Sequence, residues 1–100
     1  MIDWSRIIGF DWDDANSTKN LFKHHVEKAE AEQIFANQPL LVSADVTHSG
    51  TEIRFQALGS TNAGRHLFAA FTLRNGETLV RVISVRDMKR NERRQYAQAP

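Results

Sequence analysis

Hydrophobic and polar positions change their period once along the chain, which predicts an α+β fold. Residues 13–26 and 27–36 carry apolar side chains at helical spacing, so we expect two consecutive helices. The candidate N-caps of the first are Asp13, Asp14, Asn16 and Ser17, and Asn37 with Pro39 ends the second. The expected buried faces are Ala15, Thr18, Leu21, Phe22 and Val26 in the first helix and Ala31, Ile34 and Phe35 in the second.

After Pro39 the apolar residues recur with a period of two, which indicates strands at 40–46, 52–59, 66–73 and 78–85. We expect a turn at 47–50, a loop at 60–64 and a two-residue hairpin turn at Asn75-Gly76. A short strand at 7–12 precedes the helices, and a helix at 87–95, capped by Asp87, follows the last strand. The predicted domain, residues 1–100, is an N-terminal strand and helix pair packed on a mostly antiparallel four-stranded meander, with a short C-terminal helix.

Composition places this domain among ordinary globular proteins. Of 100 residues, 41% are hydrophobic and 25% are charged, which argues against disorder. The absence of cysteine excludes disulfides and thiolate metal sites and fits a reducing compartment. No apolar run approaches the roughly 18 residues of a membrane span, and residues 1–10 lack the pattern of a signal peptide. We therefore expect a cytoplasmic protein with no membrane contact.

The charge is divided unevenly between the two halves of the chain. Residues 1–46 hold four basic and eight acidic side chains, whereas residues 47–100 hold nine basic and four acidic ones. Such segregation steers a polyanion to one side of a small domain, or provides an acidic and a basic site for different partners. A solvated, charged C-terminal helix is the plain alternative.

The sequence lacks the common motifs of metal and nucleotide chemistry. There is no P-loop, H-E-x-x-H or G-x-S-x-G. His24 and His25 are adjacent, so on a helix they point about 100° apart and do not hold one ion together. We expect no cofactor and no dedicated metal site.

The remaining candidates suit cleavage of RNA without a metal. This reaction needs a group that takes the 2′-hydroxyl proton, a group that protonates the leaving oxygen, and fixed positive charge on the phosphate. Arg81 and Arg86 are the candidates for the phosphate, because a guanidinium binds two oxygens at once. His24 or Lys23 would assist proton transfer; the alternative for His24 is a histidine that bonds a carbonyl at the helix end.

Strand geometry limits how these arginines combine. Arg81 and Arg86 have opposite parity, so they share a face only if the strand ends or bulges between them. For Arg81 the structural alternative is an ion pair with Glu52 or Glu77. If the C-terminal helix began early, Arg86, Arg90 and Arg94 would form one cationic stripe. The remaining candidates for RNA binding, steering or contact with an acidic partner are Lys89, Arg90, Arg93 and Arg94.

Four segments in order resemble the BrnT family of type II toxins, which share a fold related to the RelE ribonucleases. They are F10-D-W-D13 with N20-L-F-K-H24, then I34-F35 with Pro39, then R54-F-Q-A-L-G59 with G64-R65, and R81-V-I-S-V-R86 with E92-R-R-Q-Y96. The resemblance implies a ribonuclease toxin that inhibits translation. By position, the family's working groups fall on Lys23, His24, Arg54, Arg81 and Arg86.

The resemblance also implies partners. A cognate BrnA-like antitoxin would neutralise the toxin, usually in a heterotetramer built through the antitoxin, and would alone contact operator DNA. Two departures bear on activity: His25 replaces a glycine, so the helix must continue or turn with a less suitable residue, and E27-K-A-E30 lacks an aromatic anchor. The alternative function is a non-enzymatic co-repressor acting with its antitoxin. A direct DNA binder is disfavoured because no helix-turn-helix pattern precedes the basic segment.

Overall fold

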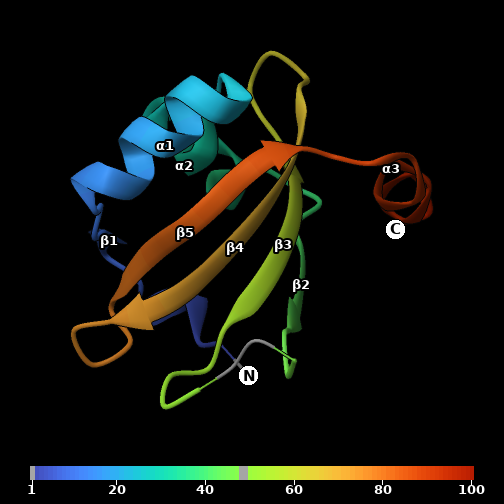
Figure 1. Cartoon of the computed structure of the whole chain (residues 1–100). Helices are drawn as coiled ribbons and strands as arrows, with labels where there is room; N and C mark the ends of the chain where they lie inside the picture. Colours follow the sequence, from blue (N-terminus) through green and yellow to red (C-terminus); the bar gives the residue numbers. More distant parts are fainter. Residues whose placement is uncertain (1, 48–49) are drawn as a thin grey trace.

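A computed structural model describes residues 2–47 and 50–100. The elements follow in the order η1 (Trp4–Arg6), β1 (Gly9–Phe10), α1 (Asp14–His24), α2 (Lys28–Ala36), β2 (Leu41–Ala44), β3 (Phe55–Ser60), β4 (His66–Arg74), β5 (Leu79–Asp87) and α3 (Arg90–Ala97). Figure 1 shows the strands side by side, with α1 beyond β5 and α3 at the opposite side. The predicted α+β class and the order of elements are confirmed.

The strands form one five-stranded sheet in the order β1-β5-β4-β3-β2. The predicted antiparallel meander of β2 to β5 is present. The first strand, however, does not pack on this meander but joins it, because β1 pairs in parallel with the beginning of β5. The sheet is therefore mixed, and β1 covers only Leu79 and Val80 of the outer edge of β5.

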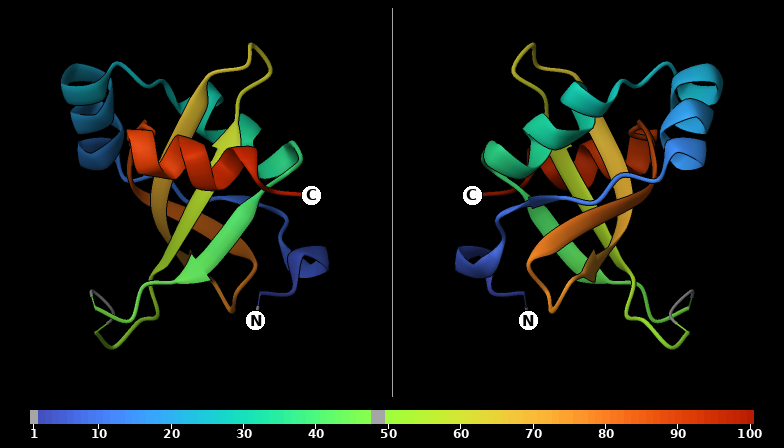
Figure 2. Two further views of the ribbon diagram at one scale, coloured as in Figure 1. Left: turned by 90° about the vertical axis from the view of Figure 1, so that its right-hand side faces the viewer. Right: turned by 90° about the vertical axis from the view of Figure 1, so that its left-hand side faces the viewer.

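The core lies between the sheet and α2. Phe71, Leu67, Val80 and Val82 of the central strands pack there against Ile34 of α2. The two views in Figure 2 show α2 on one side of the sheet and α3 on the other. We call the side that carries α3 the open face, because α3 covers only one end of it.

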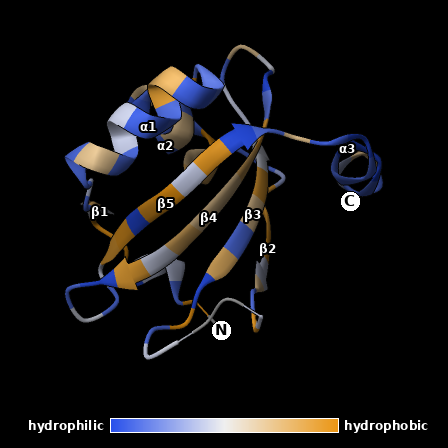
Figure 3. Cartoon of the chain, viewed as in Figure 1, coloured by the Kyte–Doolittle hydropathy of each residue, from blue (hydrophilic) through white to orange (hydrophobic). Residues whose placement is uncertain are grey.

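The third helix is anchored to the open face by few residues. Tyr96 and Met88 form a small cluster with Leu58 of β3. The hydroxyl of Tyr96 donates a hydrogen bond of 2.6 Å to the carbonyl oxygen of Pro39. Most of α3 is hydrophilic, as Figure 3 shows.

The predicted buried stripe of the first helix is wrong except for Val26, which is buried in the core just after the helix end. Leu21 and Phe22 are 44% and 78% exposed, and the helix instead buries the polar side chain of Asn20. The reason is that α1 lies along the edge of β5, where backbone N–H groups need an acceptor. The Asn20 Oδ1 accepts a hydrogen bond of 3.2 Å from the Val85 N–H.

Several predicted element limits also change. The hairpin has a loop at residues 75–78 in place of two residues, because Glu77 takes a positive φ as well as Asn75 and Gly76. Strand β5 continues to Asp87, and Lys89, not Asp87, caps α3. Arg86 is thus in the strand, so the cationic stripe of Arg86, Arg90 and Arg94 does not form. Ile53 and Arg54 precede β3, and the predicted turn at 47–50 falls partly on positions 48 and 49, outside the described residues.

Candidate functional site

A β-bulge brings Arg81 and Arg86 to the same face of the sheet. Arg81 lies opposite Thr72 of β4 and Arg86 opposite Phe68, but the register shifts at Ala70/Phe71, where Ile83 is the extra residue of β5. The parity of β5 therefore reverses between the two arginines. Val80, Val82 and Val85 stay in the core, and both arginines point to the open face.

Arg81 lies at the middle of this face and is weakly paired. Its nearest carboxylate is that of Asp11, with 3.7 Å between Nε and Oδ2. The predicted partners were wrong, since Glu52 binds Arg74 at 2.9 Å. The Arg81 Nε has no hydrogen-bond partner among the described residues, although it is buried. A guanidinium in this state favours an anion more than one whose donors are saturated.

Arg86 is held by three kinds of contact at the end of β5. Its Nη1 and Nη2 bind the two oxygens of Glu92 at 2.8 and 3.0 Å. Nη1 also donates to the carbonyl of Asp87, and the guanidinium lies 4.1 Å from the centre of the Phe68 ring. The bond from Arg86 is the main cause that lowers the pKa of Glu92. Glu92 also accepts the Lys89 N–H, so this carboxylate both caps α3 and fixes Arg86.

Lys23 and His24 lie at the C-terminal end of α1, beside the end of β5. Lys23 is exposed and His24 half-buried. Partial burial is the largest cause that lowers the pKa of His24, followed by the positive charges of Lys23, Arg86 and Lys19, while Asp87 opposes the change. The backbone of His24 is connected to the end of β5 through Arg65, which donates to the His24 carbonyl and binds Asp87. The carbonyl-bonding alternative does not apply, as the described residues include no hydrogen-bond partner for this ring.

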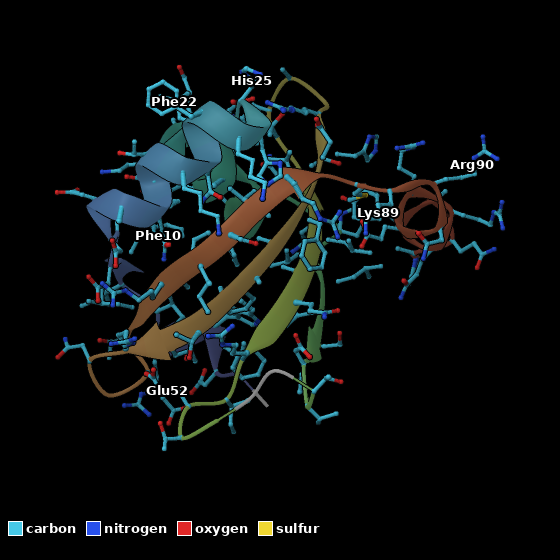
Figure 4. All side chains as sticks on the ribbon, viewed as in Figure 1. Phe10, Phe22, His25, Glu52, Lys89 and Arg90 are labelled. Carbon is cyan, nitrogen blue, oxygen red and sulfur yellow. The ribbon has the colours of Figure 1, made fainter. Side chains whose placement is uncertain are left out.

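The helix end next to His24 shows how the chain accommodates His25 in place of glycine. His25 is the C-cap of α1 and adopts the left-handed conformation, with φ 56° and ψ 39°. Its label in Figure 4 lies at the top of α1, near the loop after β3. The helix ends here and does not continue, at a conformational cost of about 1 kcal/mol for a residue with a Cβ.

Arg54 is not beside His24. It is exposed and directly precedes β3, and one further step of the β3–β4 register would place it opposite Thr72. Thr72 is itself opposite Arg81, so Arg54 lies at the level of Arg81, two strands away. Two strand spacings amount to about 10 Å.

The cations of α3 project mostly into solvent. Arg90 points away from the sheet in Figure 4. Lys89, Arg93 and Arg94 are exposed too, and Arg93 Nη1 donates to the Met88 carbonyl at 2.6 Å. They border the open face and do not line it.

Two hollows differ in chemistry. The larger, about 770 Å³, lies between the N-terminal segment and the end of α2, and its lining is mainly apolar, including Ile8, Phe10 and Phe35. The smaller, about 250 Å³, lies on the open face under α3. It is lined by Phe68 and Glu92 and by the polar side chains of Ser43, Gln56, Asn91 and Gln95. The smaller hollow adjoins Arg86, so it belongs to the candidate site.

Sequence reasoning located Arg81, Arg86, Lys23 and His24 but missed the residues that hold them. Asp11, Asn20 and Glu92 occurred in the quoted motifs without a role. Glu92 forms a capping box three residues after the N-cap Lys89, but the predicted cap, Asp87, did not have this spacing. Within residues 2–47 and 50–100 no group of three or more histidine, aspartate or glutamate side chains is arranged to hold a metal ion. The same residues contain no helix that is long and apolar enough to span a membrane.

The fold and this site define a small one-sheet α+β protein with guanidinium groups on its open face and an ammonium and an imidazole at the adjoining end of α1, a basic surface of the kind found in proteins that act on polyanions. The family model described as "Ribonuclease toxin, BrnT, of type II toxin-antitoxin system" matches residues 12–92. The chain belongs to the BrnT family of toxins, and this confirms the resemblance. Membership in a toxin–antitoxin family implies an antitoxin as its partner.

A solved structure agrees with this assignment at the level of the fold. The ribonuclease toxin BrnT of Brucella abortus, known from a crystal structure, superposes with a TM-score of 0.57 at 24% sequence identity. The match covers 83% of this chain and 99% of that one. No curated protein sequence matches the chain.

Proposed function

We propose that this protein is a metal-independent endoribonuclease that inhibits translation by cleaving RNA and is neutralised by a cognate antitoxin. The observation that carries the proposal is the bulge at Ile83, since it turns Arg81 and Arg86 to one face, while α1, which carries His24 at its end, packs along β5. The two arginines lie opposite β4 residues four positions apart, a separation of about 13 Å along the strand. Two extended guanidinium side chains on one face would bracket the scissile phosphate or bind it and its neighbour.

The reaction is transfer of the phosphoryl group to the neighbouring 2′-oxygen. The 2′-oxygen forms a bond to phosphorus as it loses its proton, and the bond from phosphorus to the 5′-oxygen breaks. His24 would take the 2′-proton, and Lys23 would give a proton to the leaving 5′-oxygen. The products are a 2′,3′-cyclic phosphate and a 5′-hydroxyl, and neither step requires an oxidant or a bound metal.

Charge and protonation support these roles. The lowered pKa of His24 leaves the imidazole neutral near pH 7, the form that accepts a proton. Arg81 would stabilise the charge on the phosphate, because its side chain is partly exposed and its ion pair with Asp11 is long, at 3.7 Å. Arg54, at the same level of the sheet, would bind the RNA further along.

The polar hollow and the α3 cations would serve binding and not chemistry. Amide and hydroxyl groups such as those of Gln56 and Ser43 match the edges of unpaired bases, and aromatic rings such as Phe68 stack on bases. Lys89, Arg90, Arg93 and Arg94 would steer RNA electrostatically or contact an acidic surface of the antitoxin. Operator DNA would be contacted through the antitoxin alone, in a heterotetramer.

The test is RNA cleavage by purified protein with a chelator present. We expect cleavage by the wild type, a loss of about 100-fold or more in Arg81→Ala, and little change in Arg6→Ala. Arg6 is a suitable control because it is exposed and its Nη2 bonds the carbonyl of Gly76 in the hairpin loop, away from the candidate site. A folded Arg81→Ala protein as active as the wild type would refute the assignment.

The alternative function, a non-enzymatic co-repressor, predicts the opposite result in the cleavage assay. It predicts no cleavage at any concentration of pure protein, and tighter operator binding when antitoxin and this protein are both present. The exposed cations of α3 are compatible with either function, so the cleavage assay is the measurement that separates them.

A further inference from the structure

Arg65, in the loop between β3 and β4, joins three parts of the protein that meet near His24. Its Nε and Nη2 bind the two oxygens of Asp87 at 2.7 and 3.1 Å, and its Nη1 lies 3.1 Å from Glu30 Oε2. Nη1 and Nη2 also donate to the carbonyls of His25 and His24, at 2.8 and 3.2 Å. We propose that Arg65 is a positioning residue, which fixes the end of α1 against the end of β5 and so holds His24 at the end of the strand that carries Arg86.

The backbone that carries Arg65 is itself well anchored. The Arg65 N–H donates to Thr61 Oγ1, the Thr61 N–H donates to the Arg65 carbonyl, and Thr61 is buried. Gln33 of α2 accepts the Asn62 N–H at 3.0 Å. The guanidinium therefore projects from a closed turn that is fastened to α2, and it transmits that position to α1.

The end of α1 needs such a partner. The last four carbonyls of a helix lack intrahelical donors, and a cation at this end is favourable to the helix dipole. Here the C-cap is a histidine in the left-handed conformation, which is less favourable than the same conformation in glycine. Arg65 donates to the two carbonyls on either side of this turn and so holds the helix end in place.

Arg65 also controls the charge around His24. The groups whose charges affect this imidazole are Lys19 and Lys23 on α1 and Arg86 and Asp87 on β5. Arg65 donates a hydrogen bond to the backbone carbonyl of His24. Asp87 is the one that opposes the others, but both of its oxygens are bound by Arg65, which is the main cause that lowers the pKa of Asp87. Without Arg65, Asp87 is left to pair with the imidazole, and the pKa of His24 rises.

Because this inference rests on the proposed ribonuclease, its test needs a readout that does not depend on cleavage. The His24 ring is titrated by NMR in the wild type, Arg65→Ala and Asp87→Asn, and cleavage is measured in parallel. In Arg65→Ala we expect the pKa of His24 to rise by at least about 0.5. We expect kcat to fall about 10- to 100-fold with KM changed less than about threefold.

Asp87→Asn gives the contrasting result. It removes the acid that raises the pKa of His24 and weakens the link from Arg65 to β5, while the bonds from Arg65 to Glu30 and to the two carbonyls remain. We therefore expect the pKa of His24 to stay or fall and kcat to fall less than in Arg65→Ala. Arg74→Ala is the stability control, because Arg74 forms a comparable ion pair of 2.9 Å with Glu52 at the other end of the sheet. If Arg65→Ala does not fold, Arg65→Lys replaces it, with a smaller change of the same sign expected.

The outcomes are distinct. A folded Arg65→Ala protein with an unchanged His24 pKa and unchanged kcat overturns the proposal, as does an equal loss of kcat in Arg74→Ala. If wild-type protein cleaves no RNA, the proposed function fails while the titration still decides whether Arg65 positions His24. If His24→Ala cleaves normally, the catalytic role of His24 fails, and the shift in Arg65→Ala remains a separate result.

Discussion

Replacing Glu92 with glutamine should weaken the fold and at the same time strengthen RNA binding. The carboxylate accepts three hydrogen bonds: two from the Arg86 guanidinium and one from the Lys89 N–H. A glutamine keeps one acceptor oxygen, loses the second bond to Arg86, and removes the negative charge. Hydrogen bonds to charged groups contribute about 1.5–3 kcal/mol, and partial solvent exposure of both side chains reduces this to about 1–2 kcal/mol.

The same contact predicts a specific pH dependence. Arg86 lowers the pKa of Glu92 in the folded state below its ordinary value of 4.5. The stabilisation from ionised Glu92 is therefore complete above the pKa that Glu92 has in the unfolded chain. It is lost as the pH falls through the lower pKa that Glu92 has in the folded protein. The difference in free energy of unfolding between wild type and Glu92→Gln should be largest at pH 7 and should decrease at acidic pH.

RNA binding should change in the opposite direction to stability. The variant releases Arg86 from its counter-ion, so one more guanidinium is available for a phosphate. The dependence of log affinity on log salt should steepen by about 0.7 on a single strand. A 2′-deoxy oligonucleotide serves as the ligand in fluorescence anisotropy, because it lacks the hydroxyl that the reaction requires.

The loss in free energy of unfolding is measured by urea denaturation, with tryptophan fluorescence as the signal, and a thermal melt gives a second measurement. The midpoint of thermal unfolding should fall by about 5–10 °C in Glu92→Gln. Glu77→Gln is the matched control, because Glu77 is exposed in the β4–β5 loop and its replacement should change stability by less than about 0.5 kcal/mol. Unchanged stability at pH 7, a difference that persists in acid, or weaker RNA binding would each refute the reasoning.

Three further outcomes are expected. Gly59→Ala should lower the free energy of unfolding by about 1–3 kcal/mol, because the new Cβ would lie 2.8 Å from the Cβ of Ile34; urea denaturation measures this. Asn20→Ala should speed hydrogen exchange of the Val85 amide, which loses its acceptor, and should cost about 1–3 kcal/mol. In the pH profile of kcat/KM, activity should rise with pH through the lowered pKa of His24, so the midpoint of this rise should lie below the ordinary value of 6.5.

Each of these outcomes has a matched comparison. Gly9→Ala should be tolerated, because its Cβ would meet only Leu79, at 3.7 Å. Thr18→Ala, an exposed substitution on α1, should leave exchange at Val85 unchanged. Equal destabilisation by both glycine variants, or equal exchange in both α1 variants, contradicts the packing and hydrogen-bond arguments. An acid limb centred at or above 6.5, or one that survives in His24→Ala, contradicts the role of His24.

What could be predicted from the sequence depends on local interactions. Asp13 was identified as an N-cap, and its Oδ1 accepts the Ala15 N–H at 2.8 Å, two residues away. The positive φ angles of Asn75 and Gly76 follow from residue type. The face of α1 was mistaken, because the partner of Asn20 is the Val85 N–H, 65 residues further along the chain. Periodicity carries no information about an edge of the sheet that exposes its N–H groups.

The residues of the candidate site also differ in whether local sequence could identify them. Arg81 and Arg86 stand out because arginine is unusual in an apolar strand, so residue type alone was enough to select them. Arg65 does not stand out, because an arginine in a polar loop looks like any solvated cation, and its role depends on Asp87, Glu30 and α1. The ion-pair partner of Arg81 was mistaken for a related reason, since Asp11 approaches only because β1 joins the sheet beside β5.

One inserted residue in β5 connects the two halves of the site. If Ile83 were paired like its neighbours and β5 had no bulge, Arg86 would lie opposite Leu67 and point into the core, where burial of a guanidinium is costly. Val85 would then point to the open face, and Glu92 would lose the side chain to which it is bonded. With the bulge, Arg86 reaches Glu92 and lies near His24, while the Val85 N–H meets Asn20 at the edge. The bulge thus sets the orientation of the cation and the docking of the helix that carries the imidazole, so the two halves of the proposed site depend on the same local backbone irregularity.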